Sequence, residues 1–265
     1  MNILVCVKQV PKEEDLRLDP ATKTLIRTQG TGVISEYDRY AMELAARLKE
    51  SAGGRVTAIT MGPPASAEVL RYCLSVGADD AYLLSDRRMG GADAYATVNV
   101  LAAAKKYIEA GGEGYDLVLC GKQASDSDTS LVMPELAEAL GCAQVTFVND
   151  FETVDGALHV RRETDDGVDV LEVPFPAVIS VGKTVFAARY PNIRLKLKAN
   201  HTEIPVLDAD TLGLDASEIG VKGSKTTVGD SYFPEKNKSC VHVTGGDAAE
   251  TAEKLVELLR RARKI

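Results

Sequence analysis

Cysteine motifs, long apolar runs and dense basic clusters are all missing from this sequence. The five cysteines show no CxxC or CxH spacing, which argues against structural zinc or an iron–sulfur cluster and points to a reducing compartment. No apolar stretch approaches the length that spans a bilayer, and Ile3 begins the first apolar run without a basic leader. The net charge is −8. We therefore expect a cytoplasmic protein without membrane insertion, metal or nucleic-acid partner.

Well-known nucleotide and catalytic motifs are missing as well. The chain contains neither GxGxxG nor the Walker string GxxxxGK[ST]. Its histidines, His159, His201 and His242, do not group with a carboxylate and a nucleophile, so a hydrolase mechanism has no support. No residue stands out as an acid, base or nucleophile. A protein that binds a redox cofactor has this profile, because the cofactor carries the chemistry.

What the sequence does contain, up to about residue 150, is an alternation of short apolar strands and amphipathic helices. The capping-box pattern of Ser35 and Asp38 predicts a helix that ends at Gly53, with Ser35 accepting from first-turn amides and Asp38 reaching back. Repeated βα units with short loops predict an α/β fold with a doubly wound, mostly parallel sheet of the adenine-nucleotide-binding type. Strands are expected at 3–7, 56–61, 81–84, 117–120 and 144–148, and further helices at 65–76, 93–108 and 131–140.

The pattern changes after about residue 150. Two apolar runs, 158–162 and 168–173, predict a β-hairpin insertion, and 177–181 is expected to rejoin the main sheet. The basic stretch 183–200 is interpreted as an exposed loop, either solvated or a docking surface. We divide the chain into a nucleotide-binding α/β domain, residues 1–200, and a C-terminal arm that lies on another chain, residues 201–265, with a helix at 247–263. Residues 11–34 are expected to form a loop or hairpin.

The candidate ligand site lies at the carboxyl ends of the predicted strands, where doubly wound sheets bind ligands. Lys8 follows the first strand and Met61 ends the second. The turn at 121–130 is more informative, because its glycine follows a strand directly, Lys122 adds a cation, and the next helix directs free amides into the crevice. We predict that this turn binds nucleotide phosphates; the alternative is a solvated loop with an ordinary helix cap at Asp128 or Thr129. Its residues are Gly121, Lys122, Gln123, Ala124, Ser125, Asp126, Ser127, Asp128, Thr129 and Ser130.

Several short segments, in the same order along nearly the whole chain, resemble the β subunit of electron transfer flavoproteins. The hairpin string 160–180 is close to the signature of that family. At Ser127 and Met133 the chain departs from it, because family members commonly have glycine there. The remaining matching segments are 5–11, 77–79, 91–93, 121–124, 187–193 and 196–199.

The resemblance implies a heterodimer with an α subunit that carries its own FAD and is wrapped by the C-terminal arm. It also implies a nucleotide in the crevice of this chain. Ile193 matches the apolar residue that family members insert into an acyl-CoA dehydrogenase, Glu163 matches a hairpin carboxylate near the α-subunit flavin, and Arg189 lies in the same docking segment as Ile193. By position, the implied nucleotide contacts are Cys6, Ser35, Glu36, Tyr37, Asp38, Met61 and the stretch from Lys122 to Met133.

The resemblance leaves two forms of the crevice nucleotide open, namely AMP in the ordinary form and a second FAD in the electron-bifurcating form. The segments 19–22, 58–64 and 193–199 look closest to bifurcating β subunits from anaerobes. In that form FAD takes a hydride from NADH and sends one electron through the α-subunit FAD to an acyl-CoA dehydrogenase, the other to ferredoxin or flavodoxin. The alternatives are a non-bifurcating carrier with structural AMP and, from another class, a nucleotide-binding regulatory module.

Overall fold

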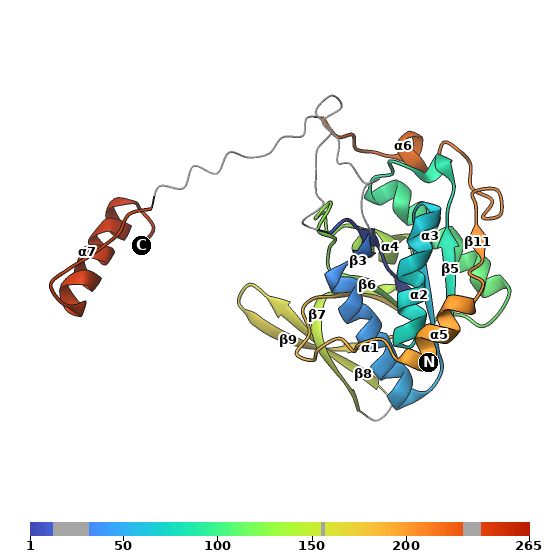
Figure 1. The fold of residues 1–265 in the computed structure, drawn as a ribbon, viewed down its shortest axis with the longest axis horizontal. Coiled ribbons are helices and arrows are strands. Elements are labelled where there is room, and N and C mark those ends of the chain that lie inside the picture. The colour runs from blue at the N-terminus through green and yellow to red at the C-terminus, as the bar shows by residue number, and fades with distance from the viewer. Residues whose placement is uncertain (13–31, 155–156, 230–239) are drawn as a thin grey trace. The chain divides into compact units, whose positions relative to one another are not determined.

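The computed structural model describes residues 1–12, 32–154, 157–229 and 240–265 (Figure 1). These residues belong to two compact units, Met1–Gly229 and Asp230–Ile265, which we describe separately. The predicted loop or hairpin at 11–34 lies largely outside the described residues. The strand before this segment, β2 (Gln9–Val10), pairs antiparallel with β3 (Val33–Ile34) at the end of the segment.

Within the described residues, the first unit is built on one nine-stranded sheet in the order β11-β5-β4-β1-β6-β10-β7-β8-β9. The strand pairs from β11 to β7 are parallel, and β7, β8 and β9 pair antiparallel. The predicted doubly wound, mostly parallel sheet with a hairpin insertion is therefore confirmed. Its strands are β1 (Asn2–Cys6), β4 (Arg55–Met61), β5 (Asp80–Leu84), β6 (Leu117–Gly121), β7 (Ala143–Val154), β8 (Ala157–Thr164), β9 (Gly167–Val173), β10 (Ala177–Val181) and β11 (Val206–Leu207).

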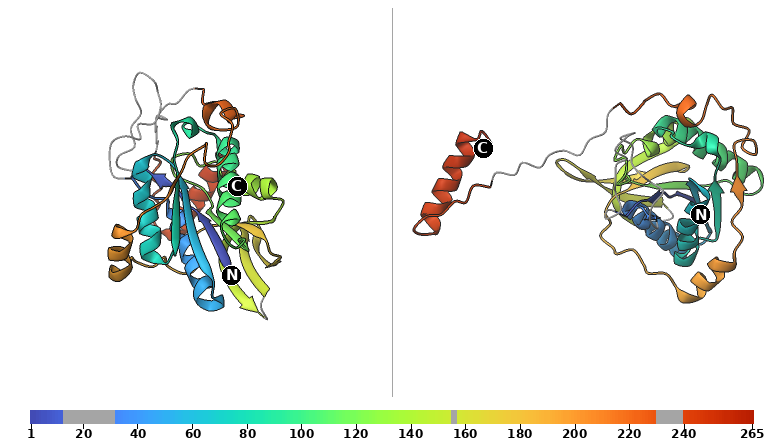
Figure 2. Two further views of the ribbon diagram at one scale, coloured as in Figure 1. Left: turned by 90° about the vertical axis from the view of Figure 1, so that its right-hand side faces the viewer. Right: turned by 45° about the horizontal axis from the view of Figure 1, so that its top comes forward.

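Helices cover both faces of the sheet (Figures 1 and 2). Alternate residues of β1 point to opposite faces, so Ile3 joins the core under α1 and α2 while Leu4 joins the core under α3 and α4. Because both faces are covered, β1 and β10 are apolar along nearly their whole length. The helices of this unit are α1 (Glu36–Ala52), α2 (Ala67–Val76), α3 (Ala94–Ala110), α4 (Val132–Leu140), α5 (Ile193–His201) and α6 (Gly220–Gly223), with short 3₁₀ turns η2 (Pro64–Ser66) and η3 (Arg87–Met89).

One segment differs from the sequence-based expectation. The stretch expected to be a basic loop contains α5, which begins where the side chain of Asn192 accepts hydrogen bonds from the amides of Arg194 and Leu195. The compact unit that contains the sheet has the range Met1–Gly229. Leu207 and Ile219 bury their side chains in this unit, and β11 pairs with the edge strand β5.

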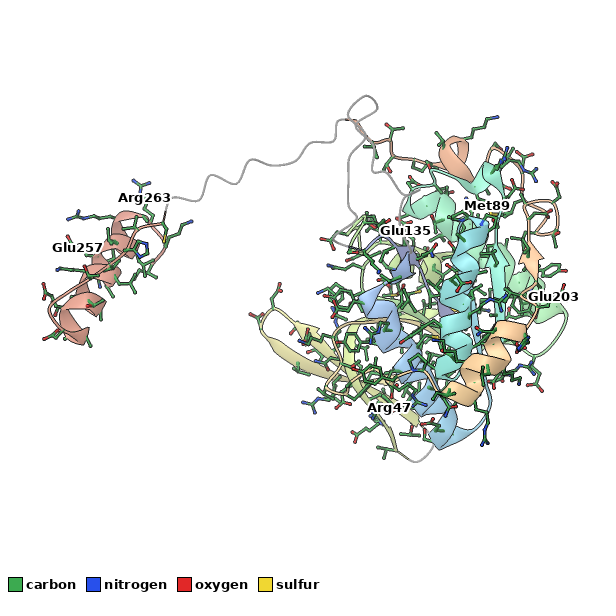
Figure 3. The ribbon with its side chains drawn as sticks, viewed as in Figure 1. Arg47, Met89, Glu135, Glu203, Glu257 and Arg263 are labelled. Atoms are coloured by element: carbon green, nitrogen blue, oxygen red, sulfur yellow. The ribbon has the colours of Figure 1, made fainter. Side chains whose placement is uncertain are left out.

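The described part of the second unit consists mainly of α7 (Ala248–Arg261), which confirms the helix expected near the C-terminus. The side chain of Asp247 accepts a hydrogen bond from the amide of Glu250 and thereby caps the helix. No residue of α7 is buried, and its side chains, including Glu257, extend from the helix (Figure 3). Among the described residues of both units, no helix combines the length and the apolar composition needed to cross a membrane.

Candidate functional site

The strand order places the topological switch point of the sheet between β1 and β6, and we call the carboxyl edge of the sheet at this point the crevice. From β1, the chain adds β4 and β5 on one side and later returns to add β6 on the other. Helix α1, after β1, covers one face, and α4, after β6, covers the opposite face. A doubly wound sheet binds its ligand at this kind of switch point. The candidate site is therefore assigned to this edge of the sheet.

Asp38 joins the two strands that border this crevice. One of its carboxylate oxygens accepts from the amide of Lys8 at 2.8 Å, and the other accepts from the amide of Gly121 at 3.0 Å. The predicted capping box is therefore wrong, because Asp38 turns toward the strand ends. Ser35 makes no capping hydrogen bond either. Its hydroxyl donates instead to the carbonyl of Gln123 at 3.4 Å and links α1 to the turn after β6.

The close approach of α1 explains the glycine at position 121. A Cβ atom added there would lie 2.3 Å from the Asp38 carboxylate and 2.9 Å from the Asp38 amide nitrogen. Asp38 is 6% exposed. Burial raises the pKa of Asp38 to about 7, although the amides of Lys8 and Gly121 and the positive charge of Lys8 act in the opposite direction. The crevice floor thus contains a carboxyl group that titrates near neutral pH.

The residues 121–130, here called the β6 turn, form a compact loop. The amides of Ser127 and Asp128 both donate to the carbonyl of Ala124, at 3.2 and 2.8 Å. Asp128 and Ser130 adopt the left-handed conformation, with φ of 53° and 56°. Ser127 does not, so the glycine that family members commonly carry at its position is not required here by a positive φ.

The ammonium of Lys8 binds side chains of the β6 turn, whereas that of Lys122, within the turn, is directed toward an aromatic ring. The Lys8 ammonium donates to the Asp126 carboxylate at 2.6 Å and to the Ser127 hydroxyl at 3.3 Å. The Lys122 ammonium instead lies 4.5 Å from the ring centroid of Phe147. Phe147, in β7, has a φ of 59°, and its amide donates to the Ser180 hydroxyl at 3.0 Å. Sequence reasoning missed Phe147, because an aromatic residue within a strand carries no signal of such a conformation.

The N-terminus of α4 faces the same edge of the sheet, because this helix follows β6. It has no side-chain cap and its N-cap position is Leu131, so the alternative of an ordinary cap at Asp128 or Thr129 is wrong. Uncapped first-turn amides favour an anion. The hydroxyls of the β6 turn lie beside them, and Lys8 offsets the charge of Asp126. The residues present therefore fit the phosphates of a nucleotide.

The remaining predicted contacts fall into two groups. Met61 ends β4 and is half-buried at the crevice edge, and Glu36 and Tyr37 occupy the first turn of α1. Cys6 and Met133, by contrast, are buried in the core under α3 and α4. The structure thus brings Lys8, Ser35 and Asp38 together with the β6 turn, whereas the side chain of Met133 belongs to the core.

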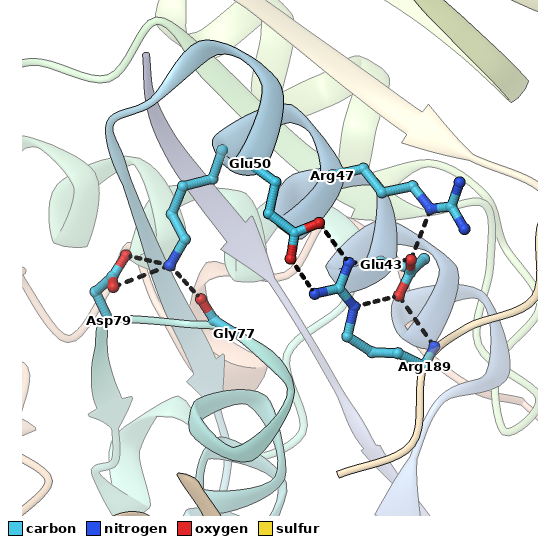
Figure 4. A network of polar contacts seen from close by, with 7 residues as sticks. Glu43, Arg47, Glu50, Gly77, Asp79 and Arg189 are labelled. Atoms are coloured by element: carbon cyan, nitrogen blue, oxygen red, sulfur yellow. Dashed lines mark hydrogen bonds and ion pairs between the residues drawn. The ribbon is translucent and has the colours of Figure 1, made fainter. Parts of the chain in front are cut away.

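A second candidate surface lies around α5. Ile193 is 79% exposed and Tyr190, which sequence reasoning missed, is 88% exposed. Leu197, one turn after Ile193, is exposed as well, and these three side chains are here called the α5 surface. The predicted docking residue Glu163 is exposed on β8, where its carboxylate accepts from the side-chain amide of Asn149 at 3.2 Å. The guanidinium of Arg189, in contrast, forms ion pairs with the carboxylates of Glu43 and Glu50 in α1 (Figure 4).

The fold and the crevice define an α/β protein of the adenine-nucleotide-binding type. A family model described as the electron transfer flavoprotein domain matches residues 22–212. The chain is 42% identical, over the full length of both, to the electron transfer flavoprotein subunit beta of Thermoanaerobacterium thermosaccharolyticum. It is 38% identical, also over both full lengths, to the caffeyl-CoA reductase-Etf complex subunit CarD of Acetobacterium woodii. Protein FixA of Azotobacter vinelandii is 38% identical, over 89% of this chain and 85% of that protein.

These matches show the family: the chain belongs to the electron transfer flavoproteins, as a β subunit. Its role is accordingly in electron transfer, and membership of the family implies pairing with an α subunit. The family also implies that a flavin or another nucleotide takes part, in agreement with the crevice at the carboxyl edge of the sheet.

Proposed function

We propose that this chain is the β subunit of an electron-bifurcating electron transfer flavoprotein and that its crevice binds FAD. When bound, FAD would supply the redox chemistry: the two electrons of a hydride from NADH would leave one at a time, one through the α-subunit FAD to an acyl-CoA dehydrogenase and the other to ferredoxin or flavodoxin, and the proton would be released. The observation that carries the proposal is the crevice itself, in which Asp38 joins β1 and β6 beside the uncapped α4. CarD, whose name places it in a complex with a reductase of a CoA thioester, supports a partner of that chemical class.

The chain's own residues would bind and orient the nucleotide. The hydroxyls of Ser127, Thr129 and Ser130 and the first-turn amides of α4 would hold its phosphates. Asp128, which is exposed on the turn, would accept from ribose hydroxyls. The remaining predicted contacts would line the crevice, directly or through their backbone: Cys6, Lys8, Ser35, Glu36, Tyr37, Asp38, Met61, Gly121, Lys122, Gln123, Ala124, Ser125, Asp126 and Met133.

The proposed partners correspond to separate surfaces. Ile193, on the α5 surface, would dock on the dehydrogenase, and Glu163 would lie near the α-subunit flavin. The amphipathic helix α7, with Leu255, Val256 and Leu258 all exposed, would bind the α subunit. We place the protein in the cytoplasm, where its five cysteines would remain free thiols.

The stoichiometry of flavin in the purified heterodimer tests this proposal. We expect two flavins per heterodimer after gentle purification, and bleaching of flavin absorbance when NADH is added without oxygen. One flavin with one AMP, and no response to NADH, would instead identify a non-bifurcating carrier that takes electrons from acyl-CoA dehydrogenases. A chain that folds alone and copurifies with no flavin-containing partner would indicate a nucleotide-binding regulatory module.

A further inference from the structure

Helix α1 carries a buried carboxylate outside the crevice. The side chain of Glu43 is 3% exposed, and it accepts from the Arg189 amide at 3.0 Å and from Arg189 Nε at 2.7 Å (Figure 4). Arg47 Nε donates to its other oxygen at 2.7 Å. A buried carboxylate is costly unless it is paired and hydrogen-bonded. The position of Arg189 therefore depends on a group that is firmly fixed in the helix.

A second carboxylate, two turns further along α1, binds the other end of the same guanidinium. Glu50 accepts from Arg189 Nη1 at 2.5 Å and from Nη2 at 3.1 Å, which is a bidentate arrangement. Hydrogen bonds from Arg189 lower the pKa of Glu50, so this partner is ionised at neutral pH. We call Arg189 with Glu43 and Glu50 the Arg189 clamp. Its guanidinium is too fully engaged within this chain to serve as a contact for a partner.

The Arg189 clamp fixes the chain immediately before the α5 surface. Because the amide of Arg189 is bonded as well as its side chain, the backbone itself is tied to α1. Three residues later, the amide of Asn192 donates to the carbonyl of Ser75 in α2 at 3.0 Å. Tyr190 lies between these two attachments and points to solvent, and Ile193 follows directly. The conformation that exposes the two apolar side chains is thus set by contacts on either side of Tyr190.

We propose that Arg189 is a positioning residue for docking: it does not touch the dehydrogenase but holds Tyr190 and Ile193 in the conformation that the dehydrogenase binds. This inference rests on the proposed function, in which the α5 surface docks on an acyl-CoA dehydrogenase. Docking then requires little ordering of the chain, because that conformation exists before the partner arrives. Without the Arg189 clamp, the segment samples other conformations, and the apparent affinity falls in proportion to the population that remains competent.

The test uses the heterodimer with its α subunit and an acyl-CoA dehydrogenase purified from the same organism as electron acceptor. We expect Arg189→Gln to raise the KM for the dehydrogenase about tenfold. The kcat at saturating dehydrogenase, the flavin content and NADH oxidation by an artificial acceptor should stay within about twofold of wild type, because the crevice is not altered. Arg189→Lys, which keeps the charge but not the bidentate geometry, should recover part of the loss.

A matched control separates positioning from general destabilisation. Arg88 also joins two carboxylates, those of Asp86 and Asp210, but lies away from α5. Arg88→Gln should leave the KM for the dehydrogenase unchanged. An equal rise in KM in both arginine variants would overturn the proposal. If Arg189→Gln does not fold, Glu50→Gln, which removes only the exposed partner, should raise the KM about threefold with normal flavin content; an unchanged KM would overturn it equally.

The outcome also separates this inference from the proposed function. If Tyr190→Ala and Ile193→Ala raise the KM but Arg189→Gln does not, docking stands and the positioning role is wrong. If none of the three variants changes the KM, the α5 surface is not the docking site, and both ideas fail together. Loss of flavin or of NADH oxidation in parallel with the rise in KM would make Arg189 a residue of general stability, which contradicts the proposal.

Discussion

The crevice and the α5 surface both depend on α1, yet they use its side chains in opposite ways. At the start of the helix, Asp38 and Ser35 turn inward and bond to backbone groups of the crevice. Further along, Glu43 and Glu50 bind Arg189, and the residues beyond it leave large apolar side chains in solvent. A small ligand requires fixed polar groups that converge on it, whereas a protein partner requires exposed apolar side chains that it can cover. One helix can support both because the two sets of residues lie on different turns.

The first prediction, with the largest expected effect, concerns the close contact between α1 and the crevice. Gly121→Ala should lower the free energy of unfolding by about 5 kcal/mol and abolish nucleotide binding, because the new methyl group collides with Asp38. Gly112→Ala is the matched control, since an added Cβ there meets nothing within 4 Å, and it should cost less than about 1 kcal/mol. Chemical denaturation and bound-nucleotide analysis of both variants check this. A fully stable, loaded Gly121→Ala protein would contradict the close approach of α1.

The second prediction concerns the titration of Asp38. The folded-state pKa of about 7 is above the ordinary 3.8, so the proton stabilises the folded state, and this stability is lost as the pH rises through 7. Between pH 4 and pH 8 the unfolding free energy of the wild type should therefore fall by up to ~4 kcal/mol relative to Asp38→Asn, which lacks this titration. Denaturation of both proteins across that pH range measures the difference. Parallel curves would show that Asp38 does not titrate in this window.

The general position of the crevice was predictable from the sequence, because short apolar runs such as 3–7 and 117–120 are typical of parallel strands covered on both faces. The hydrogen bonds within the crevice were not predictable. Ser35 and Asp38 fit a local capping box, and only the fold reveals that Asp38 lies beside the amides of Lys8 and Gly121, which are distant along the chain. In the folded protein, long-range hydrogen bonds of Asp38 therefore take the place of the local capping box.

The α5 surface was less predictable than the crevice. The basic character of 183–200 favours an exposed loop. In 193–201, leucine and lysine alternate, so the sequence lacks the apolar spacing of three and four residues that indicates an amphipathic helix. The N-cap at Asn192 was a signal that could have been used. The pairing of Arg189 with Glu43 could not have been inferred from one sequence, because nothing local connects residues so far apart.

The third prediction tests whether the β6 turn contributes to nucleotide binding in the crevice. Asp128→Ala should weaken nucleotide retention by about tenfold, because it removes the carboxylate proposed to accept from ribose hydroxyls. The fold should stay intact, because Asp128 is an exposed residue of the turn, where it has the left-handed conformation. Asp128→Asn separates the two properties, since asparagine tolerates this conformation and can still hydrogen-bond to a hydroxyl. It should retain the nucleotide better than alanine does. Equal flavin content in wild type and Asp128→Ala would place the nucleotide elsewhere.

The smallest expected effect concerns the α5 surface. Ile193→Ala should slow electron delivery to the acyl-CoA dehydrogenase by about fivefold, because it removes an exposed apolar side chain that the partner would cover. NADH oxidation by an artificial acceptor, which in the proposed function depends on the crevice and not on α5, should not change. Parallel steady-state assays with the two acceptors measure both rates in one preparation. Equal losses in both assays would mean that Ile193 supports the fold and not the docking. The α5 surface would then lose its role as a protein contact, and the contrast with the crevice would not hold.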